Sequence, residues 1–121
     1  MNVDHEEIRK WQKAMCQARQ KLQRLVAEVG HARQVIEMDG DRRKRLLARY
    51  KKGYLDQGLS NADADTQARA DDDYGKDLDE WAESLEAAFT VRDDWTATQA
   101  KLEAARSLHS VARDTLRSHP E

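Results

Sequence analysis

The stretch from residue 8 to residue 53 reads IRKWQKAMCQARQKLQRLVAEVGHARQVIEMDGDRRKRLLARYKKG, and its apolar residues recur at alternating steps of three and four. Eleven of the fourteen positions in this series are apolar or alanine. Such a sustained heptad is typical of an α-helix that lies along another helix. We call the series the first seam; it consists of Ile8, Trp11, Met15, Ala18, Leu22, Leu25, Val29, Ala32, Ile36, Asp39, Arg43, Leu46, Tyr50 and Gly53.

The composition favours long helices throughout the 121 residues, which we expect to form a single domain. Ala, Leu, Glu, Lys and Arg together make up almost half of the chain, which is typical of coiled coils. The one proline is Pro120, so the remaining residues are free to be helical. The sequence therefore predicts an all-α fold.

The first helix is predicted over about 4–56. Asp4 and Glu7 have the spacing of a capping box, and Val3 precedes them as the first half of a hydrophobic staple. Gly58 can adopt the left-handed conformation that ends a helix, so we expect the turn at 57–60.

The second helix is predicted over about 61–117. Ser60 and Asp63 repeat the capping spacing at its start, and His119-Pro120 ends it. Its apolar face is less regular than the first seam and consists of Tyr74, Leu78, Trp81, Leu85, Phe89, Trp95, Leu102, Ala105, Leu108 and Ala112.

Asp39-Gly40-Asp41 is the weakest point of the first helix, because a glycine in a helix interior costs about 1 kcal/mol. Asp41 could then cap a new helix. The pattern favours one continuous helix, and the broken form remains the alternative.

Two long helices joined by a short turn form an antiparallel hairpin, in which the numbers of facing residues sum to about 117. A lone hairpin leaves much aromatic surface in water, so we expect self-association into a four-helix or larger bundle, or a different partner protein. The residues expected at this interface are Trp11, Leu22, Leu25, Tyr50, Trp81, Phe89 and Trp95.

A basic run is the strongest functional signal. Its seven cations can bind the phosphates of nucleic acid, and Tyr50 and Tyr54 could stack on bases. The alternative is purely structural pairing, because hairpin geometry places the run opposite 65–75, where Asp65 and the three aspartates at 71–73 lie. The candidate nucleic-acid-binding residues are Arg42, Arg43, Lys44, Arg45, Arg49, Lys51 and Lys52.

The remaining polar residues indicate no metal site, cofactor or catalytic centre. A calcium-binding loop that starts at Asp63 fails, because its sixth and twelfth positions hold Ala68 and Tyr74. The four histidines are scattered without ligand spacing, and a thiol at Cys16 falls beside the seam without an activating neighbour. We expect a protein that is not an enzyme.

The sequence contains no apolar run long enough to cross a bilayer, and its one cysteine cannot form an internal disulfide. We therefore expect no membrane partner and a cytoplasmic location. The charge is divided between a balance of +6 over 1–57 and −8 over 58–121, which favours pairing within or between chains.

Several short segments resemble small coiled-coil proteins of bacteriophages and prophages that are encoded near single-strand annealing and recombination genes. The segments are 49–53, 58–60, the alanine-rich 61–70, Tyr74 and 105–113. The resemblance implies a homo-oligomer that helps to load or organise a recombinase on single-stranded DNA, with 42–52 facing the DNA. The alternatives are an inhibitor or adaptor that binds a host protein complex, such as a phage anti-defence protein, and an assembly scaffold.

Overall fold

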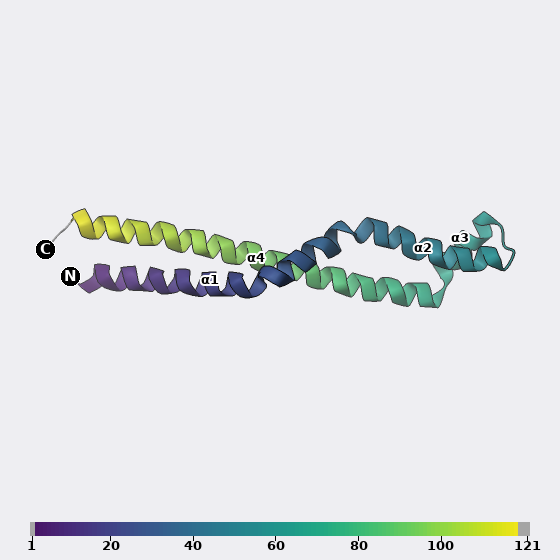
Figure 1. Ribbon diagram of the computed structural model, residues 1–121, viewed down its shortest axis with the longest axis horizontal. Helices are drawn as coiled ribbons and strands as arrows, with labels where there is room; N and C mark the ends of the chain where they lie inside the picture. The colour runs from purple at the N-terminus through teal and green to yellow at the C-terminus, as the bar shows by residue number, and fades with distance from the viewer. Residues whose placement is uncertain (1, 119–121) are drawn as a thin grey trace. The chain divides into compact units, whose positions relative to one another are not determined.

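The computed structural model describes residues 2–118, with side chains from residue 5 onwards. The described chain forms four helices and no strand: α1 (Asn2–Glu37), α2 (Asp39–Asp56), α3 (Asn61–Ala70) and α4 (Asp72–Ser118) (Figure 1). This confirms the predicted all-α class. α1 begins two residues before the expected start, and the cap contacts predicted for Val3 and Asp4 lie outside the described side chains, as does the stop at His119-Pro120.

The chain divides into two compact units. The terminal unit combines Met1–Gly30 with Val91–Glu121, and the central unit is His31–Thr90. Each unit therefore contains part of α1 and part of α4, and the central unit also contains α2 and α3.

The terminal unit pairs α1 and α4 through small apolar side chains. Its core cluster is Met15, Ala18, Leu102 and Ala105, against which Trp11, Ala14 and Leu22 pack. The Lys21 Nζ lies 2.7 Å from the Asp94 Oδ1. Residue numbers rise along α1 as they fall along α4, so the two segments are antiparallel.

The first predicted helix is interrupted at Met38, so the continuous helix over 4–56 is wrong at this one residue. Met38 keeps helical dihedral angles, and the Arg42 N–H donates to the Met38 carbonyl at 2.9 Å. No new extended N-cap is formed, so the Asp41 carboxylate does not cap α2 but pairs with Arg45 at 3.1 Å.

The turn after α2 is as predicted. Gly58 has a φ of 94°, the Gly58 N–H donates to the Leu55 carbonyl at 2.9 Å, and α2 ends at Asp56. The Ser60 Oγ accepts from the Asp63 N–H at 3.2 Å, which caps α3.

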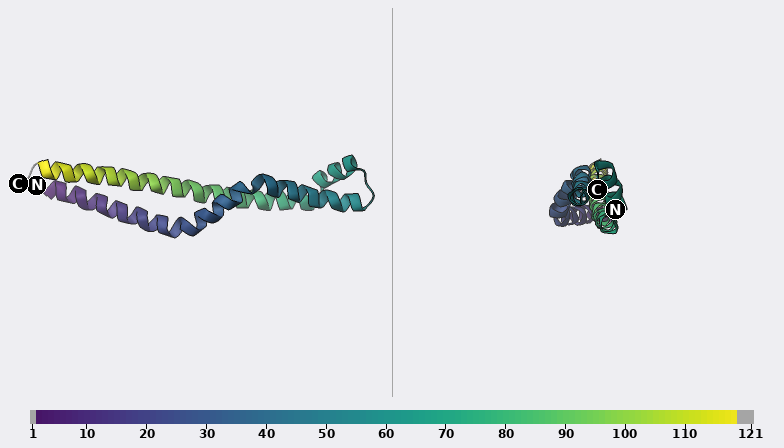
Figure 2. Two further views of the ribbon diagram at one scale, coloured as in Figure 1. Left: turned by 45° about the horizontal axis from the view of Figure 1, so that its top comes forward. Right: turned by 90° about the vertical axis from the view of Figure 1, so that its right-hand side faces the viewer.

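The second predicted helix is broken at Asp71, which separates α3 from α4. The Asp71 Oδ1 accepts from the N–H groups of Asp73 (2.8 Å) and Tyr74 (3.3 Å) and so caps α4. α3 packs against α2 in both side views, and its buried face contains Ala64 and Ala68, each with 0% exposure (Figures 1 and 2). A side-chain cap together with alanine packing stabilises the break that helix propensity alone does not predict.

This break shifts the register of the central unit. Tyr50 is expected to face residue 67 but its hydroxyl donates to Asp77, and Tyr54 donates to Asp71. The ten residues of α3 lie between the turn and α4, so α4 enters the pairing later than a simple hairpin predicts.

The first seam is confirmed by burial. Twelve of its fourteen positions are buried or half-buried, and only Arg43 and Gly53 are exposed. The buried positions of α4 recur more regularly than the apolar residues predicted for the second helix. Thr98 (2% exposed) and Ala88 (5% exposed) are also buried, and they fill gaps in that series. The Thr98 hydroxyl donates to the Asp94 carbonyl at 2.7 Å, which satisfies the buried polar group.

Candidate nucleic-acid interface

α2 carries a cationic stripe, defined here as Arg42, Arg45, Arg49 and Lys52. Their spacing of three, four and three places them on one helix face, and all four are exposed. The three arginines line a shallow depression together with Met38, Asp41 and Leu46. Guanidinium groups gathered in this way can bind phosphate oxygens.

Neutralisation of these cations is partial. Asp41 pairs with Arg45, and Asp39 pairs with Arg43 at 3.0 Å within the same helix. Arg49 lies 3.4 Å from Asp77 of α4. Exposed pairs of this kind contribute little to stability and leave the cations hydrated.

The other four cations of the run are Arg42, Lys44, Lys51 and Lys52, and they form no ion pair with any described residue. α2 holds seven cations and three carboxylates. It therefore presents a positively charged surface.

The expected pairing of this run with the aspartates of 65–75 is wrong. Asp65 bonds Arg69 at 2.9 Å, and Asp71 accepts from Tyr54. The reason is the register shift at Asp71, which brings Asp77 rather than the earlier aspartates to α2.

Trp81 of α4 lies beside the N-terminal end of the cationic stripe. Its Nε1–H donates to the Asp39 Oδ1 at 2.6 Å, and the Arg42 guanidinium lies 4.6 Å from its ring centroid. The cation–π contact orients Arg42 without neutralising its charge.

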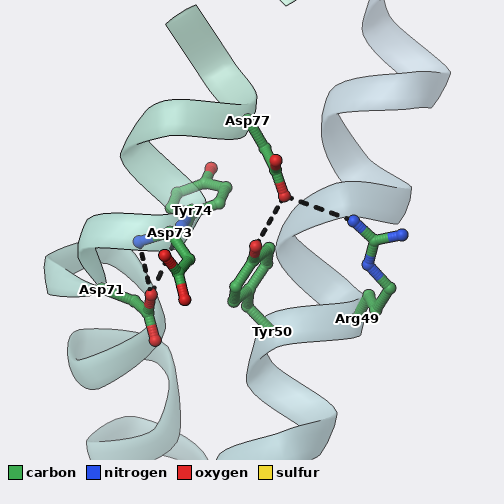
Figure 3. Close-up of polar contacts among 6 residues, drawn as sticks. All are labelled: Arg49, Tyr50, Asp71, Asp73, Tyr74 and Asp77. Atoms are coloured by element: carbon green, nitrogen blue, oxygen red, sulfur yellow. Dashed lines mark hydrogen bonds and ion pairs between the residues drawn. The ribbon is translucent and has the colours of Figure 1, made fainter. Parts of the chain in front are cut away.

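Two tyrosines of α2 donate hydrogen bonds to carboxylates of the segment that faces α2 in the same chain. The Tyr50 hydroxyl donates to the Asp77 Oδ2 at 2.5 Å, and the same oxygen accepts from Arg49 (Figure 3). The Tyr50 and Tyr74 rings are 5.5 Å apart at a tilt of 56°. The hydrogen bond to Asp77, with desolvation and the carboxylate charge, raises the pKa of Tyr50 to about 12.

Tyr54 makes the second of these bonds, with its hydroxyl 2.6 Å from the Asp71 Oδ2. The bond raises the pKa of Tyr54 and lowers the pKa of Asp71, whose carboxylate also accepts two backbone N–H groups. Because both hydroxyls are engaged and both rings are half-buried, base stacking on Tyr50 and Tyr54 finds no support in this geometry.

The residues predicted for a partner interface are distributed over both units. All seven are half-buried, and Trp11 and Leu22 pack against the terminal core cluster. The Trp11 indole N–H donates to Glu7 at 2.9 Å, and the Tyr50 and Trp81 polar groups bond within the chain. Contact with a partner remains a prediction for Trp11, Leu22, Leu25, Tyr50, Trp81, Phe89 and Trp95.

The sequence patterns did not predict an apolar groove in the terminal unit. Ala14 and Ala18 of α1 and Ala104 and Ala105 of α4 line it, with Trp11, Leu108 and other residues beside them. The signal was present as alanines spaced four apart on α1, because small side chains leave room between helices.

His109 and Cys16 are two further side chains with chemistry of their own. The His109 Nε2 is buried and has no hydrogen-bond partner among the described residues, and Cys16 is exposed. Within residues 2–118 no group of three His, Cys, Asp or Glu side chains is arranged to hold a metal ion.

The length and apolar character of the helices bear on the prediction that the chain has no membrane partner. Of the helices in the described part of the chain, none combines the length and apolar character needed to span a bilayer. Comparison with known proteins gives no assignment: no protein-family model, no curated protein and no solved structure matches the chain.

Proposed function

We propose that this chain is a non-enzymatic, cytoplasmic coiled-coil protein that contacts the phosphates of single-stranded DNA through α2. The observation that carries the proposal is the exposed cationic stripe, whose acidic neighbours are too few to neutralise the helix. Binding of cations to a nucleic-acid backbone releases condensed counterions, which drives association at low salt.

The wider role rests on the resemblance to phage proteins encoded near recombination genes. In that role the protein loads or organises a recombinase on single-stranded DNA. Since Tyr50 and Tyr54 are held by Asp77 and Asp71, α2 contributes phosphate contacts, and the bases stay free for the recombinase.

Assembly is the second part of the proposal: each chain is a helical hairpin, and two hairpins form a four-helix bundle. Among the described residues no large side chain is fully buried. Association would bury apolar side chains that stay exposed in one chain, such as Val26 (57% exposed) and Val111 (61% exposed).

The test is fluorescence anisotropy of a labelled single-stranded oligonucleotide at several salt concentrations. The test variant combines Lys44→Gln, Arg45→Gln and Lys52→Gln, because these cations form no ion pair with α4 among the described side chains. We expect affinity to fall at least tenfold at low salt and the salt slope to decrease by about 2, since each lost phosphate contact removes about 0.7.

A matched control removes three exposed cations of the terminal unit by Arg19→Gln, Arg24→Gln and Arg106→Gln. The control should bind almost as the unmodified chain does. Absence of binding at low salt, or an equal loss in both triple variants, would refute the proposal.

The apolar groove favours a second candidate function, a protein-binding module that acts as inhibitor, adaptor or scaffold. Leu108 is 42% exposed and Val111 is 61% exposed one turn further along α4, which extends the apolar surface beyond the groove. A chain that binds no oligonucleotide but retains a partner protein after Arg42 to Lys52 are neutralised would support this candidate.

A further inference from the structure

The central unit carries an acidic stripe beside the cationic one. We define it as Asp73, Asp77 and Glu80 of α4, whose spacing of four and three places them on one face. Each residue directly precedes a buried or half-buried seam residue: Tyr74, Leu78 and Trp81.

The cationic stripe has the same relation to its own helix. Arg45 directly precedes Leu46, and Arg49 directly precedes Tyr50. In two antiparallel helices, positions one step before each seam lie on the same side of the pair. The ion pair between Arg49 and Asp77 agrees with this placement.

Most charges on this side have no partner in the facing helix. Among the described residues Arg49–Asp77 is the one ion pair between α2 and α4, and Asp73 and Glu80 are exposed. α2 has four more cations than carboxylates, whereas residues 72–90 hold seven carboxylates and one lysine. One side of the central unit therefore presents a positive strip next to a negative strip.

We propose that this side docks on the same side of a second copy of the chain, with each α2 lying against α4 of the other copy. Two isologous arrangements can bring the surfaces together. A two-fold axis across the helices puts α2 on α2 and the acidic segments on each other, which opposes like charges. A two-fold axis along the helices pairs each positive strip with a negative one, and charge complementarity selects it.

Contacts within one chain show which residues of α2 and α4 lie at the same height along the helix axes. Arg49 lies level with Asp77, and Arg42 lies level with Trp81. A two-fold axis along the helices preserves these levels, so Arg45 meets Glu80 of the second copy and Lys52 meets Asp73.

Apolar groups accompany these charges. Met38 is 51% exposed and Leu46 is half-buried in the depression lined by the arginines, and the half-buried Trp81 lies against Arg42. Docking would cover these side chains, which gives the contact an apolar component in addition to ion pairs that salt screens.

The experiment exchanges the charges of the two strips. One variant carries Arg45→Glu and Lys52→Glu, and the other carries Asp73→Lys and Glu80→Lys. Sedimentation equilibrium at low salt, without nucleic acid, should show at least tenfold weaker self-association for each variant alone. An equimolar mixture should associate again. In a mixed dimer the glutamates introduced into α2 of the first variant meet the lysines introduced into α4 of the second, and the unchanged basic α2 of the second meets the unchanged acidic α4 of the first.

A matched control reverses two cations of the terminal unit, Arg19→Glu and Arg24→Glu, and should self-associate as the unmodified chain does. Circular dichroism verifies that every variant stays helical. A monomeric unmodified chain at micromolar concentration, or a mixture that fails to associate, would overturn the proposal.

Cross-linking of the unmodified chain keeps the test decisive if a variant unfolds. A carbodiimide joins lysines to carboxylates, and a mixture of isotope-labelled and unlabelled chains separates links between chains from links within one. Mixed-label peptides joining Lys52 to Asp73 support the docking, and exclusively same-label peptides contradict it. Docking engages Arg45 and Lys52, which the DNA-binding proposal also uses, so a second copy and DNA would compete for these cations. The cross-links are measured without nucleic acid and therefore report on docking alone.

Discussion

The terminal and central units pair antiparallel helices by different interactions. The terminal unit is packed by Met15, Ala18, Leu102 and Ala105. In the central unit, Tyr50 and Tyr54 donate hydrogen bonds to Asp77 and Asp71, and α2 contributes no fully buried residue. The same heptad can thus be completed by apolar contacts or by hydrogen bonds, and the two units should respond differently to mutation and to pH.

The largest difference is expected from Leu102→Asp. Leu102 is 7% exposed in the terminal core, so the change removes apolar contacts and buries an unpaired charge. We expect a loss of about 3–5 kcal/mol in unfolding free energy. Amide hydrogen exchange should show faster exchange in the terminal unit than in the central unit.

Glu103→Ala is the control for that change, because Glu103 is the exposed neighbour on the same helix. Its effect should stay within about 0.5 kcal/mol. Equal effects of the two substitutions would show that the terminal seam is assigned incorrectly.

Alkaline pH should destabilise the central unit more than the terminal unit, which is the reverse of the effect of Leu102→Asp. The pKa of Tyr50 is raised from 10.0 to about 12, so the folded state holds this proton more tightly than the unfolded chain does. Its contribution to stability is complete below pH 10 and is lost as the pH rises through 12. The pKa of Tyr54 is raised as well, and all three tyrosines of the chain lie in the central unit.

The measurement is tyrosinate absorbance and hydrogen exchange between pH 9 and pH 12. The central unit should loosen in this range while the terminal unit keeps its protection. Tyr50→Phe removes the bond to Asp77 and should remove the titration near pH 12. A chain in which every tyrosine titrates near pH 10 would contradict this assignment.

Smaller effects are expected at two glycines of the central unit. Gly53 lies inside α2 with open space around the position of a Cβ, so Gly53→Ala should stabilise the chain by about 0.5–1 kcal/mol. Gly58 also has open space but a φ of 94°, so Gly58→Ala should destabilise it by about 1–2 kcal/mol. Thermal unfolding followed by circular dichroism measures both, and shifts of the same sign would contradict the helix end at Gly58.

The prediction of helices succeeded where the signal is local. The ends at Asp56 and Asn61 follow from Gly58 and Ser60, whose conformational and capping preferences depend on adjacent residues alone. The cationic stripe is likewise visible in the sequence, because residues at steps of three and four share a helix face whatever lies opposite.

The carboxylates that meet this stripe could not be predicted in the same way. Asp71 stands in a run of three aspartates, and the sequence does not distinguish which of them caps a helix. The cap at Asp71 separates α3 from α4, and this break changes which residues face each other in the central unit.

The sequence by itself determined the helical class, the first seam, the turn and the charge of α2, since each depends on periodicity or on neighbouring residues. Only the tertiary structure decided that Tyr50 meets Asp77, that Ala64 and Ala68 are buried in the central unit, and that the cations of α2 are left largely unpaired. The physical reason is that register depends on the balance between side-chain caps, small-residue packing and hydrogen bonds across helices, and a single chain's pattern does not contain the distances that decide it.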